Sequence, residues 1–552
     1  MKNLLSEIGI SACVSDERNN GRIINIEFQG KLREDQHPAA EAMLEHENGV
    51  LSATTAFGKT VIGAFLIAKR KTNTLILVHS SALLSQWKKA LEQFLDIHEA
   101  LPELPKKRGR KKTQTLVGQL GSGKNTLSGI VDIAIMQSLF DGDEVKELVR
   151  NYGMIICDEC HHVPAISFER ILATANAKYV YGLTATPLRQ DGHQPIIFMQ
   201  CGAIRYRVDA KAQAARREFD HYIIPRFMAT RISVSEAGNP TIQEIYASLV
   251  NNSQRNTEIV KDVSAAVNAG RSPLVLTERK EHAAVLANLL AESCKSIVLL
   301  VGSDSQKQKR EKLEALKRIP VSEPLIVVAT GKYIGEGFDE PRLDTLFLAM
   351  PISWKGTLAQ YAGRLHRSFE GKQEVRIYDY VDVHIQVLER MYQKRLRGYA
   401  ELGYQAKSAV SDEKIGIIFD GKNFYAPFSQ DISGIAREAL IISPFMKRAR
   451  VAGMLKLLAE PLSQKAMITI ITRPPENYKL SDQPEIAALI SELKEAGVAA
   501  ITKNNIYQKY AVLDKAVVWY GSINFLSFGR SEESIMRFEN ADIAGELIDV
   551  NM

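Results

Sequence analysis

The sequence predicts an α/β protein with two doubly wound parallel sheets in tandem and a third, smaller α/β domain. Three observations predict this fold. The chain has 552 residues, which is more than one hydrophobic core accommodates. Short apolar runs alternate with helical stretches twice in succession, the rhythm of βαβ units in a parallel sheet. From about residue 406 the character of the chain changes, and a third alternating segment follows.

The first unit is expected over residues 29–208, after a lead-in of residues 1–28. Its helices are expected at Pro38–Glu45, Ile62–Lys69 and Ala82–Phe94. Strands are expected at Ile23–Phe28, at the end of the lead-in, and then at Leu75–Val78, Ile130–Met136, Met154–Cys157 and Tyr179–Leu183. The carboxyl ends of such strands are where an α/β sheet presents groups to ligands.

The second unit is expected over residues 223–405, after a polar hinge at residues 209–222. Helices at His282–Glu292 and Gln306–Lys317 separate its first three strands, and a last helix at Ile385–Tyr404 closes it. Its strands are expected at Leu274–Thr277, Ser296–Val301, Leu325–Ala329, Thr345–Ala349 and Val375–Tyr380.

The third domain is expected over residues 406–552. Lys414–Pro427 is typical of a β-hairpin, with Asp420 and Gly421 as its turn. Strands that alternate with amphipathic helices are then expected at Ala439–Ile442, Ala466–Thr472, Val498–Thr502 and Tyr510–Trp519.

The composition is that of a soluble globular protein, with 45% hydrophobic and 24% charged residues. The net charge of +6 permits nucleic-acid binding without requiring it. No apolar run approaches the roughly 20 residues that span a bilayer, and we identify no signal peptide, so no membrane partner is expected. Five scattered cysteines form no disulfide framework, which favours a reducing, cytoplasmic setting.

The segment SATTAFGKTV, Ser52–Val61, has the layout of a phosphate-binding loop between an apolar run and a helix. Gly58 permits close approach of backbone N–H groups to phosphates, Lys59 neutralises terminal oxygens, and the Thr60 hydroxyl ligates Mg²⁺. Ala53 stands where the stricter pattern has its first glycine, a departure that leaves this mechanism intact.

Two adjacent carboxylates follow the apolar run at residues 154–157. Asp158 is expected to hold magnesium through water, and Glu159 to orient or deprotonate the attacking water. An acidic surface turn is the structural alternative. Thr184 and Thr186 lie after the next apolar run, where their hydroxyls are expected to couple the state of the nucleotide to the neighbouring domain.

The same stretch, Cys157–His162, contains the CxxCH pattern of haem attachment, or of a metal cluster. Covalent haem attachment would also need export, for which we find no signal. We therefore interpret both cysteines as strand and turn residues.

Near the end of the second unit, two arginines are candidates for completing the phosphate site. On a helix, Gln360, Arg364 and Arg367 occupy positions i, i+4 and i+7, which lie on one face. Arginines projected into another domain's phosphate site stabilise the transferring phosphoryl group, with effects of about 10³–10⁵ in rate. Because they would arrive only when the two units close, hydrolysis would open and shut a clamp.

In these motifs the chain resembles the superfamily 2 helicases, most of all the branch of the excision-repair helicase and the restriction-enzyme motor subunits. The resemblance covers about residues 29–405 and implies two tandem RecA-like domains. The motifs occur in the family's order: LRxxQ at residues 32–36, ATTAFGKT, DECH, LTATP, ATGKYIGEGFD at residues 329–339, and QYAGRLHR. RQD at residues 189–191 is similar to a charged triplet of the repair branch, with Gln190 as a departure.

The resemblance implies ATP and Mg²⁺ as cofactors, with hydrolysis driving movement along a nucleic-acid strand. It implies nucleotide contacts by Gln36, Gly58, Lys59, Thr60, Gln360, Gly337 and Asp339. It also implies phosphate-backbone contacts by Ser80, Gln137, Ser138, Thr277 and Thr330, although helix capping is the alternative use of a lone Ser or Thr. Backbone contacts give little sequence preference. The branch points to DNA, double-stranded or forked, rather than RNA.

The run PKKRGRKK, at residues 105–112, is strongly basic. It is either a loop that touches phosphates or a solvated surface insertion, and its position does not decide between them. GQLGSGK at residues 118–124 lacks Ser or Thr after its lysine, so we interpret it as a turn that faces nucleic acid rather than a second phosphate loop.

The C-terminal domain resembles the phospholipase D-like superfamily in one signature, HxKx4Dx6GSxN. Lys509, Asp514, Ser522 and Asn524 match its spacing, whereas Tyr507 stands where the nucleophilic histidine belongs. The resemblance implies phosphate contacts by Lys509, Ser522 and Asn524. Three interpretations remain open: a phosphodiester-binding module without hydrolysis, a nuclease that uses Tyr507 as nucleophile, and a tyrosine that merely packs beside a strand.

The sequence thus predicts a DNA-stimulated ATPase that moves along or unwinds DNA, with a degenerate C-terminal domain for DNA grip or dimerisation. The settings in which related proteins with such domain pairings occur suggest a role in restriction, repair or defence. One copy of the signature normally supplies half of a two-copy site, which suggests a homodimer, and the short lead-in leaves room for a separately encoded partner subunit. The alternatives are an ATP-driven nuclease and a non-catalytic scaffold that uses ATP only to close around DNA.

Overall fold

The computed structural model describes residues 15–54, 56–101, 115–160, 165–185, 194–228, 230, 240–334, 338, 340–353, 355–407, 414–528 and 533–549. The chain divides into two compact units, Met1–Asp209 and Ala210–Met552, which we describe separately. Among the described residues, none of the helices is both long and apolar enough to cross a membrane.

Unit 1 is built on one sheet, in the order β12-β2-β11-β10-β3-β7-β5-β6. Its strands pair in parallel except for the antiparallel β5–β6 pair. The strands expected at residues 75–78, 130–136, 154–157 and 179–183 are confirmed within one or two residues. The bounds are β2 (Asn48–Ser52), β3 (Thr74–Val78), β5 (Val117–Gly121), β6 (Lys124–Asn125), β7 (Val131–Ile135), β10 (Met154–Asp158), β11 (Tyr179–Thr184) and β12 (Ile204–Arg207).

Helices cover both faces of this sheet, because its central strands carry apolar side chains on both sides. On β10, Met154 and Ile156 pack into one buried cluster, and Ile155 and Cys157 into another. The first cluster holds α2 (His37–Leu44), α3 (Lys59–Arg70) and α4 (Ser81–Phe94), and the second holds α5 (Ala165–Thr174) and α6 (Gln194–Cys201). The sheet is therefore doubly wound.

Short elements complete unit 1. The strand expected at residues 23–28 is shorter than expected: β1 (Ile26–Phe28) pairs only with β4 (Leu95–Ile97), in a small antiparallel sheet of its own. The remaining elements are β8 (Phe140–Asp141), β9 (Glu144–Val145) and the 3-10 helices η1 (Met136–Leu139) and η2 (Glu147–Asn151).

Unit 2 contains a second parallel sheet, which forms the second lobe (residues 210–404). Its strand order is β15-β16-β14-β17-β18-β13, and every pair is parallel. The bounds are β13 (Asp220–Met228), β14 (Pro273–Thr277), β15 (Ile297–Leu300), β16 (Ile326–Thr330), β17 (Thr345–Leu348) and β18 (Glu374–Asp382). The five strands expected here are confirmed, whereas β13 was not foreseen.

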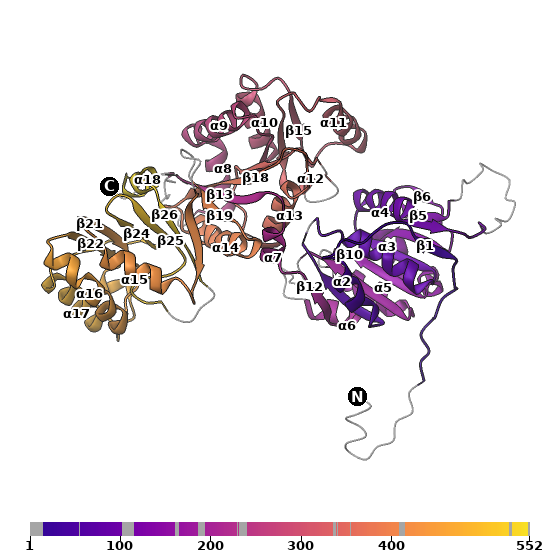
Figure 1. The fold of residues 1–552 in the computed structure, drawn as a ribbon, viewed down its shortest axis with the longest axis horizontal. Helices are drawn as coiled ribbons and strands as arrows, with labels where there is room; N and C mark the ends of the chain where they lie inside the picture. Colours follow the sequence, from indigo (N-terminus) through magenta and orange to yellow (C-terminus); the bar gives the residue numbers. More distant parts are fainter. Residues whose placement is uncertain are drawn as a thin grey trace, which may run out of the picture. The chain divides into compact units, whose positions relative to one another are not determined.

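The helices of the second lobe flank this sheet (Figure 1). They are α7 (Ala210–Ala215), α8 (Ile242–Asn251), α9 (Ser253–Asn268), α10 (Lys280–Leu290), α11 (Gln306–Arg318), α12 (Gly331–Ile334), α13 (Lys355–Leu365) and α14 (Gln386–Leu402). The segment expected as a hinge, residues 209–222, holds α7 and the start of β13.

The C-terminal domain (residues 405–549) continues the same sheet rather than forming a separate one. The strand order runs on from β13 through β19-β20-β26-β25-β24-β21-β22-β23. The strands are β19 (Gln405–Lys407), β20 (Lys414–Asp420), β21 (Glu438–Ile442), β22 (Met467–Thr472), β23 (Ala499–Thr502), β24 (Tyr510–Leu513), β25 (Val517–Gly521) and β26 (Ser534–Glu539). Its helices are α15 (Tyr425–Ser433), α16 (Arg448–Ser463), α17 (Gln483–Glu495) and α18 (Ala541–Asp549), with the 3-10 helix η3 (Pro475–Asn477).

Two expectations for this domain are wrong. The predicted hairpin at residues 414–427 is the strand β20 followed by α15, and β20 pairs with β19 and β26 instead. The predicted single strand at residues 510–519 is an antiparallel pair, β24 and β25. The chain reverses at Asp514 and Lys515, which both have positive φ.

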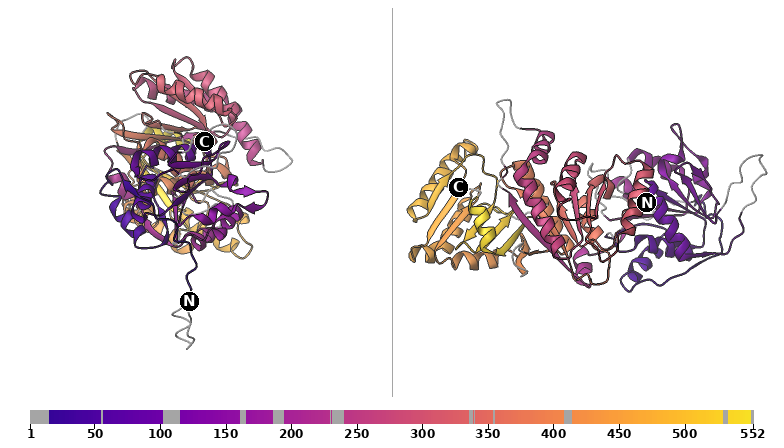
Figure 2. Two further views of the ribbon diagram at one scale, coloured as in Figure 1. Left: turned by 90° about the vertical axis from the view of Figure 1, so that its right-hand side faces the viewer. Right: turned by 90° about the horizontal axis from the view of Figure 1, so that it is seen from above.

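Side chains from the second lobe and the C-terminal domain interlock where the sheet continues. Arg226 on β13 lies 3.1 Å from Glu546 of α18 and 3.0 Å from Asp262 of α9. The Gln393 amide of α14 donates to the Gly521 carbonyl oxygen at 2.9 Å. The right-hand view of Figure 2 shows the C-terminal domain, in orange and yellow, against the second lobe. These contacts and the shared sheet join the two parts of unit 2.

Candidate functional site

The phosphate-binding segment leaves the carboxyl end of β2 and enters α3. Gly58 caps the helix with φ of +89°, a left-handed conformation that favours glycine. A Cβ at this position would lie 2.4 Å from the Gln36 side-chain nitrogen. The backbone conformation therefore favours glycine, as the sequence predicts for a loop whose N–H groups approach a phosphate.

Lys59, the first residue of α3, makes an ion pair within this site. Its ammonium lies 2.9 Å from the Glu159 carboxylate and donates to the Ala53 carbonyl oxygen at 3.3 Å. Both side chains are largely buried. The structure thus brings together the lysine and one of the carboxylates that the sequence singled out.

Asp158, at the end of β10, is almost fully buried. One of its oxygens accepts a hydrogen bond from the Trp87 indole at 2.7 Å, and the other from the Glu159 backbone N–H at 3.0 Å. Burial raises the pKa of Asp158 to about 6, with a further upward contribution from Glu159 that Lys59 opposes. Trp87 was not foreseen, and only its place on α4, which follows the neighbouring strand β3, could have indicated it.

The next strand, β11, leads to a residue that contacts the Glu159 carboxylate. Thr184, the last residue of β11, pairs with Ser52 in register, and its carbonyl oxygen accepts from the Ala53 N–H at 2.9 Å. The Ala185 N–H donates to Glu159 at 3.3 Å. Thr184 therefore borders the start of the phosphate loop, and its predicted coupling role stays a prediction. Thr186 lies outside the described residues.

Gln36 contacts the phosphate loop from outside. Its side-chain N–H donates to the Phe57 carbonyl oxygen at 2.7 Å, as does the Arg33 guanidinium, also at 2.7 Å. Its side-chain oxygen accepts from the Arg33 backbone N–H at 2.9 Å. Gln36 thereby fixes the loop next to Gly58, and its predicted contact with adenine stays a prediction.

The residues available for a metal ion are the Thr60 hydroxyl and the Asp158 carboxylate. Such hard oxygen donors suit Mg²⁺, which keeps several waters and takes further ligands from phosphates. The part of the chain that the structure describes has no cluster of three or more His, Cys, Asp or Glu side chains suited to a metal. The donor set therefore fits Mg²⁺ bound together with a nucleotide, rather than a dedicated protein cage.

The two cysteines of the CxxCH pattern lie in the core of unit 1, whereas its histidine, His161, lies outside the described residues. Cys157 and Cys160 are free and buried in one apolar cluster with Cys201. Burial raises the pKa of the Cys160 thiol well above its usual range. These cysteines are core residues, as the interpretation of the pattern as strand and turn expects.

In the second lobe, Gln360 and Arg364 lie on α13, and the Arg364 guanidinium donates to the Phe338 carbonyl oxygen at 2.9 Å. Arg367 does not share this helix, because α13 ends at Leu365 and the His366 N–H bonds to the Gly363 carbonyl oxygen in a tighter turn. The expectation of three residues on one helical face is wrong for Arg367. Gly337 and Asp339 lie outside the described residues.

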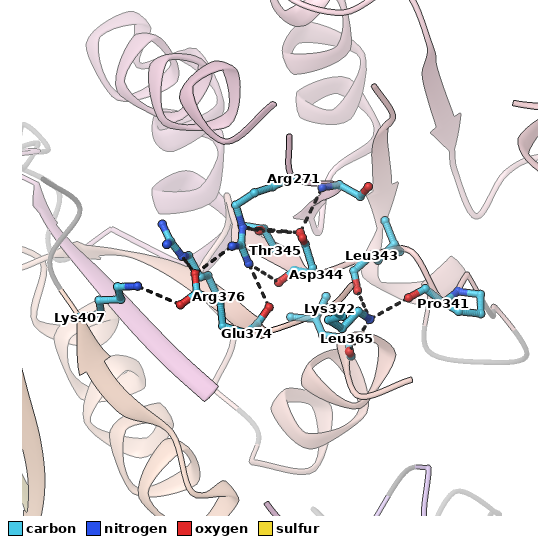
Figure 3. A network of polar contacts seen from close by, with 11 residues as sticks. Arg271, Pro341, Leu343, Asp344, Thr345, Leu365, Lys372, Glu374, Arg376 and Lys407 are labelled. Atoms are coloured by element: carbon cyan, nitrogen blue, oxygen red, sulfur yellow. Dashed lines mark hydrogen bonds and ion pairs between the residues drawn. The ribbon is translucent and has the colours of Figure 1, made fainter. Parts of the chain in front are cut away.

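Lys372 organises the chain that follows α13 (Figure 3). Its ammonium lies within 3.0 Å of four carbonyl oxygens, those of Pro341, Leu343, Leu365 and Arg367. Burial lowers the pKa of Lys372 to about 8, with Arg271 adding to the effect and Asp344 and Glu340 opposing it. One partly buried ammonium therefore ties the end of the predicted arginine motif, at Leu365 and Arg367, to the chain ahead of β17. No motif in the sequence indicated Lys372.

A buried ion pair anchors the segment that leads into α13. Arg395 of α14 makes two hydrogen bonds to Asp379 of β18, at 2.7 and 2.8 Å, and donates to the Ile352 carbonyl oxygen at 2.7 Å. The Tyr399 hydroxyl donates to the same carboxylate at 2.7 Å. Sequence reasoning missed this pair, because a charged residue in an amphipathic helix normally indicates a solvated face.

The predicted nucleic-acid residues occupy strand ends and helix caps. Ser80 caps α4 by accepting from the Leu83 N–H at 3.3 Å, the capping role that the sequence leaves open. Thr277 and Thr330 are register partners at the carboxyl ends of β14 and β16. Their hydroxyls contact His282 at 2.9 Å and the Gly302 N–H at 3.1 Å. Their predicted phosphate contacts stay predictions.

The remaining predicted nucleic-acid contacts follow β7 and β5, the strands towards the β6 edge of the sheet of unit 1. Gln137 and Ser138 form part of η1, where Gln137 is exposed. The segment predicted as a turn at residues 118–124 is mostly strand, since β5 and β6 pair across a turn at Ser122 and Gly123. The basic run at residues 105–112 lies outside the described residues.

The signature residues of the C-terminal domain fall into two groups. Asp514 lies at the far end of β24, where its carboxylate accepts the backbone N–H groups of Ala436, Arg437 and Glu438. At the opposite end of the strands, Ser522 and Asn524 follow β25, and Tyr507 and Lys509 precede β24.

The second group is engaged within the protein. Ser522 accepts from the Ser534 N–H at 2.9 Å. The Asn524 oxygen accepts from the Ser443 hydroxyl at 2.6 Å, and its amide donates to the Phe445 carbonyl oxygen at 2.8 Å. Lys509 acts electrostatically on Glu389 of α14, a buried carboxyl whose pKa burial raises to about 7 against this charge.

Comparisons with known proteins match the same part of the chain. A family model, that of the type III restriction enzyme res subunit, matches residues 29–189. Protein 161L of Invertebrate iridescent virus 6, a helicase by name, is 25% identical over 402 residues, which are 70% of this chain and 84% of that protein.

Two further likenesses cover less of the relative. The DNA 3'-5' translocase XPB2 of Sulfurisphaera tokodaii is 28% identical over 186 residues, 34% of this chain and 38% of that protein. A structure of the ATP-dependent type ISP restriction-modification enzyme LlaBIII bound to DNA aligns with a TM-score of 0.48 and 15% identity, over 85% of this chain and 40% of that one. The sequence matches support a superfamily 2 helicase relationship and an ATP-hydrolysing enzyme.

Proposed function

We propose that this chain is an ATP-dependent DNA translocase or helicase, and that its C-terminal domain binds nucleic acid without hydrolysing it. The observation that carries the proposal is the arrangement around Lys59. A glycine-capped helix start, a lysine, and two carboxylates at the end of β10 meet at the carboxyl edge of one parallel sheet. That edge is where α/β sheets bind ligands.

Each residue of this arrangement has a definite task in hydrolysis. The N–H groups at the start of α3 and the Lys59 ammonium receive the phosphates. When Lys59 moves to the phosphate oxygens, it leaves the Glu159 carboxylate, which then orients the attacking water. Asp158 and Thr60 would hold Mg²⁺, which would neutralise charge on the phosphates. The Trp87 hydrogen bond keeps Asp158 pointing into the site.

The second lobe supplies the remaining charge. Arg364 on α13 and Arg367 just beyond it are positioned by Lys372 and by the Arg395–Asp379 pair. We propose that they complete the phosphate site when the two units approach, which couples hydrolysis to a change in the separation of the units. Thr277 and Thr330, the predicted nucleic-acid contacts at the strand ends of the second lobe, would then move with that lobe.

DNA is the substrate that the relatives favour. One relative is named a DNA translocase, another of Haloarcula marismortui is named for a DNA 3'-5' helicase, and one from a mimivirus is named for an RNA helicase. RNA is therefore an arm of the test. For a nuclease, Tyr507 would need a base, and its hydroxyl donates only a long hydrogen bond of 3.4 Å to Asn505. The side-chain oxygen of an amide is no general base, so we do not propose cleavage.

ATP turnover by the purified chain tests the proposal. Hydrolysis is measured with no nucleic acid and with single-stranded, duplex and forked DNA or the same sequences in RNA, beside Lys59→Ala. We expect strong stimulation by DNA and near-background turnover for the variant. Turnover at or below about one per minute, unchanged by any nucleic acid, would instead identify a scaffold. Stimulation by RNA alone would replace DNA as the substrate.

A further inference from the structure

Three side chains at one edge of the C-terminal domain form a stack. The Arg473 guanidinium lies 4.5 Å from the ring centre of Phe445 and 4.9 Å from that of Tyr507. Phe445 follows β21, Arg473 follows β22, and Tyr507 precedes β24. Because β21 and β22 are parallel and β24 runs antiparallel to β21, these three positions lie at the same edge of the sheet.

Hydrogen bonds fix the stack from both sides. The Arg473 guanidinium donates twice to the Ile506 carbonyl oxygen, at 3.0 and 2.9 Å, from Nε and one Nη. Asn524 holds the backbone of Phe445 through its amide, at 2.8 Å, and the Tyr478 ring meets Phe445 edge-on at 6.0 Å. Residues of the degenerate signature, Tyr507 and Asn524, thus build this stack instead of a hydrolytic centre.

The stack nevertheless leaves binding capacity at the surface. Phe445 is 41% exposed, although its ring packs against Arg473 and Tyr478. The second Nη of Arg473 has no acceptor among the described residues, although a guanidinium offers five N–H donors. An exposed aromatic face beside a free guanidinium edge offers a base a stacking surface and a phosphate a charged donor.

We infer that Phe445, Arg473 and Tyr507 form a stacking platform for an unpaired nucleotide of a nucleic-acid strand. The base would stack on Phe445, and a flanking phosphate would accept from Arg473. A paired base inside a duplex has both faces covered by its neighbours, so the platform selects single strands and frayed ends. This inference rests on the proposed function only in that the chain handles nucleic acid.

The test uses the full chain without ATP and a short single strand that carries 2-aminopurine, whose fluorescence falls on stacking. We expect Phe445→Ala to abolish the fall and to weaken single-strand binding by about 10- to 100-fold, the range of one stacked base. Phe445→Tyr should restore both. Tyr425→Ala removes another aromatic side chain of similar exposure, 42%, and should change neither. Melting temperatures verify that each variant folds.

Further arms separate the alternatives. Single-stranded DNA and RNA should be affected alike, because both present an aromatic base, whereas a blunt duplex should bind Phe445→Ala as tightly as the parent. Unchanged quenching by Phe445→Ala, or an equal loss for the duplex, would overturn the platform. Duplex-stimulated ATP hydrolysis should not change in Phe445→Ala. If the chain hydrolysed no ATP but still quenched 2-aminopurine in a Phe445-dependent way, the proposed translocase function would be wrong and the stacking platform would be supported.

Discussion

The Lys59 ammonium lies 2.9 Å from the Glu159 carboxylate, so each neutralises the other within a largely buried site. In the proposed function both groups need a different partner, phosphate oxygens for the lysine and water for the carboxylate. The pair therefore holds the two side chains near their working positions and keeps either charge from being buried alone, which would cost several kcal/mol.

Glu159→Gln should separate binding from hydrolysis. The amide keeps the size of the side chain and a weaker hydrogen bond to Lys59, but it accepts no proton from water. We expect kcat to fall by about 10²–10⁴, while the affinity for a fluorescent ATP analogue stays within a few-fold of the parent. Lys59→Ala is the contrasting control and should lose both. Hydrolysis at the parent rate by Glu159→Gln would contradict the role of this carboxylate.

Arg364→Lys should lower the rate at saturating ATP and DNA, since a lysine lacks the planar, multidentate donor of arginine. The expected loss approaches the range of about 10³–10⁵ that arginine fingers supply. Arg367→Lys is measured in parallel, because Arg367 leaves the helix and need not act as Arg364 does. If both variants retained full hydrolysis, the second lobe would not complete the site.

Lys372 gives a pH dependence of activity. Its pKa is lowered to about 8, so its ammonium loses a proton as the pH rises through that value. Four carbonyl oxygens around α13 then lose their charged donor, and we expect DNA-stimulated hydrolysis to fall above pH 8. Lys372→Arg stays charged and should flatten this alkaline limb, whereas Lys372→Met should be poorly active at every pH.

Folding stability should follow the opposite sign for this group. Between about pH 8 and 10.5 the unfolded chain holds the Lys372 proton and the folded chain does not, so this group makes unfolding less favourable as the pH rises. An activity that falls while the contribution of Lys372 to stability rises would exclude simple alkaline unfolding. An alkaline limb that persists in Lys372→Arg would show that another group titrates.

The buried Arg395–Asp379 pair allows position to be tested apart from folding. Arg395→Met alone leaves Asp379 without its cation, and we expect a loss of about 3–5 kcal/mol, read as a lower melting temperature. The triple variant Arg395→Met, Asp379→Leu, Tyr399→Phe also removes the carboxylate and the hydroxyl bonded to it, and should regain most of that stability. It should still hydrolyse ATP slowly, because the Ile352 carbonyl remains untethered ahead of α13. Full activity in the triple variant would make the pair merely structural.

Tyr507→His restores the residue that the phospholipase D-like signature normally has. We expect supercoiled plasmid to remain uncut, because Asn524 is hydrogen-bonded to Ser443 and Phe445. The Lys509 charge, in turn, acts on the buried Glu389 carboxyl. Incubation with Mg²⁺ and ATP, followed by agarose electrophoresis, detects a single nick. Cleavage that depends on the new histidine would mean that the signature still forms an open catalytic site.

The elements that could be read from the sequence are those whose signal is local. β3, β10, β11, β14 and β16 are continuous apolar runs, so their prediction needs no knowledge of the rest of the chain. The phosphate loop is equally local, since Gly58, Lys59 and Thr60 are adjacent. β13 escaped prediction because His221 and Arg226 interrupt it. Those side chains are accommodated by Arg217 nearby and by Glu546, which lies 320 positions along the chain.

The errors in the C-terminal domain have the same origin. Asp514 and Lys515 turn the chain at positive φ without a glycine, which hid the boundary between β24 and β25. Asp420 and Gly421 do form a turn, but α15 follows it, because the partner strands of β20 come from distant segments. Lys372, Arg395 and Trp87 were missed for a related reason: their roles depend on carbonyl or carboxylate groups that only the fold brings near.

The unbroken sheet from β15 to β23 has a mechanical consequence. Backbone hydrogen bonds cross from β13 to β19 and from β19 to β20, so the outermost domain is attached by a β-ladder as well as by the covalent chain. If a nucleotide rotates the second lobe, as the proposed function requires, the C-terminal domain should rotate with it as one body. A strand end held at the tip would then travel farther than the lobe that drives it.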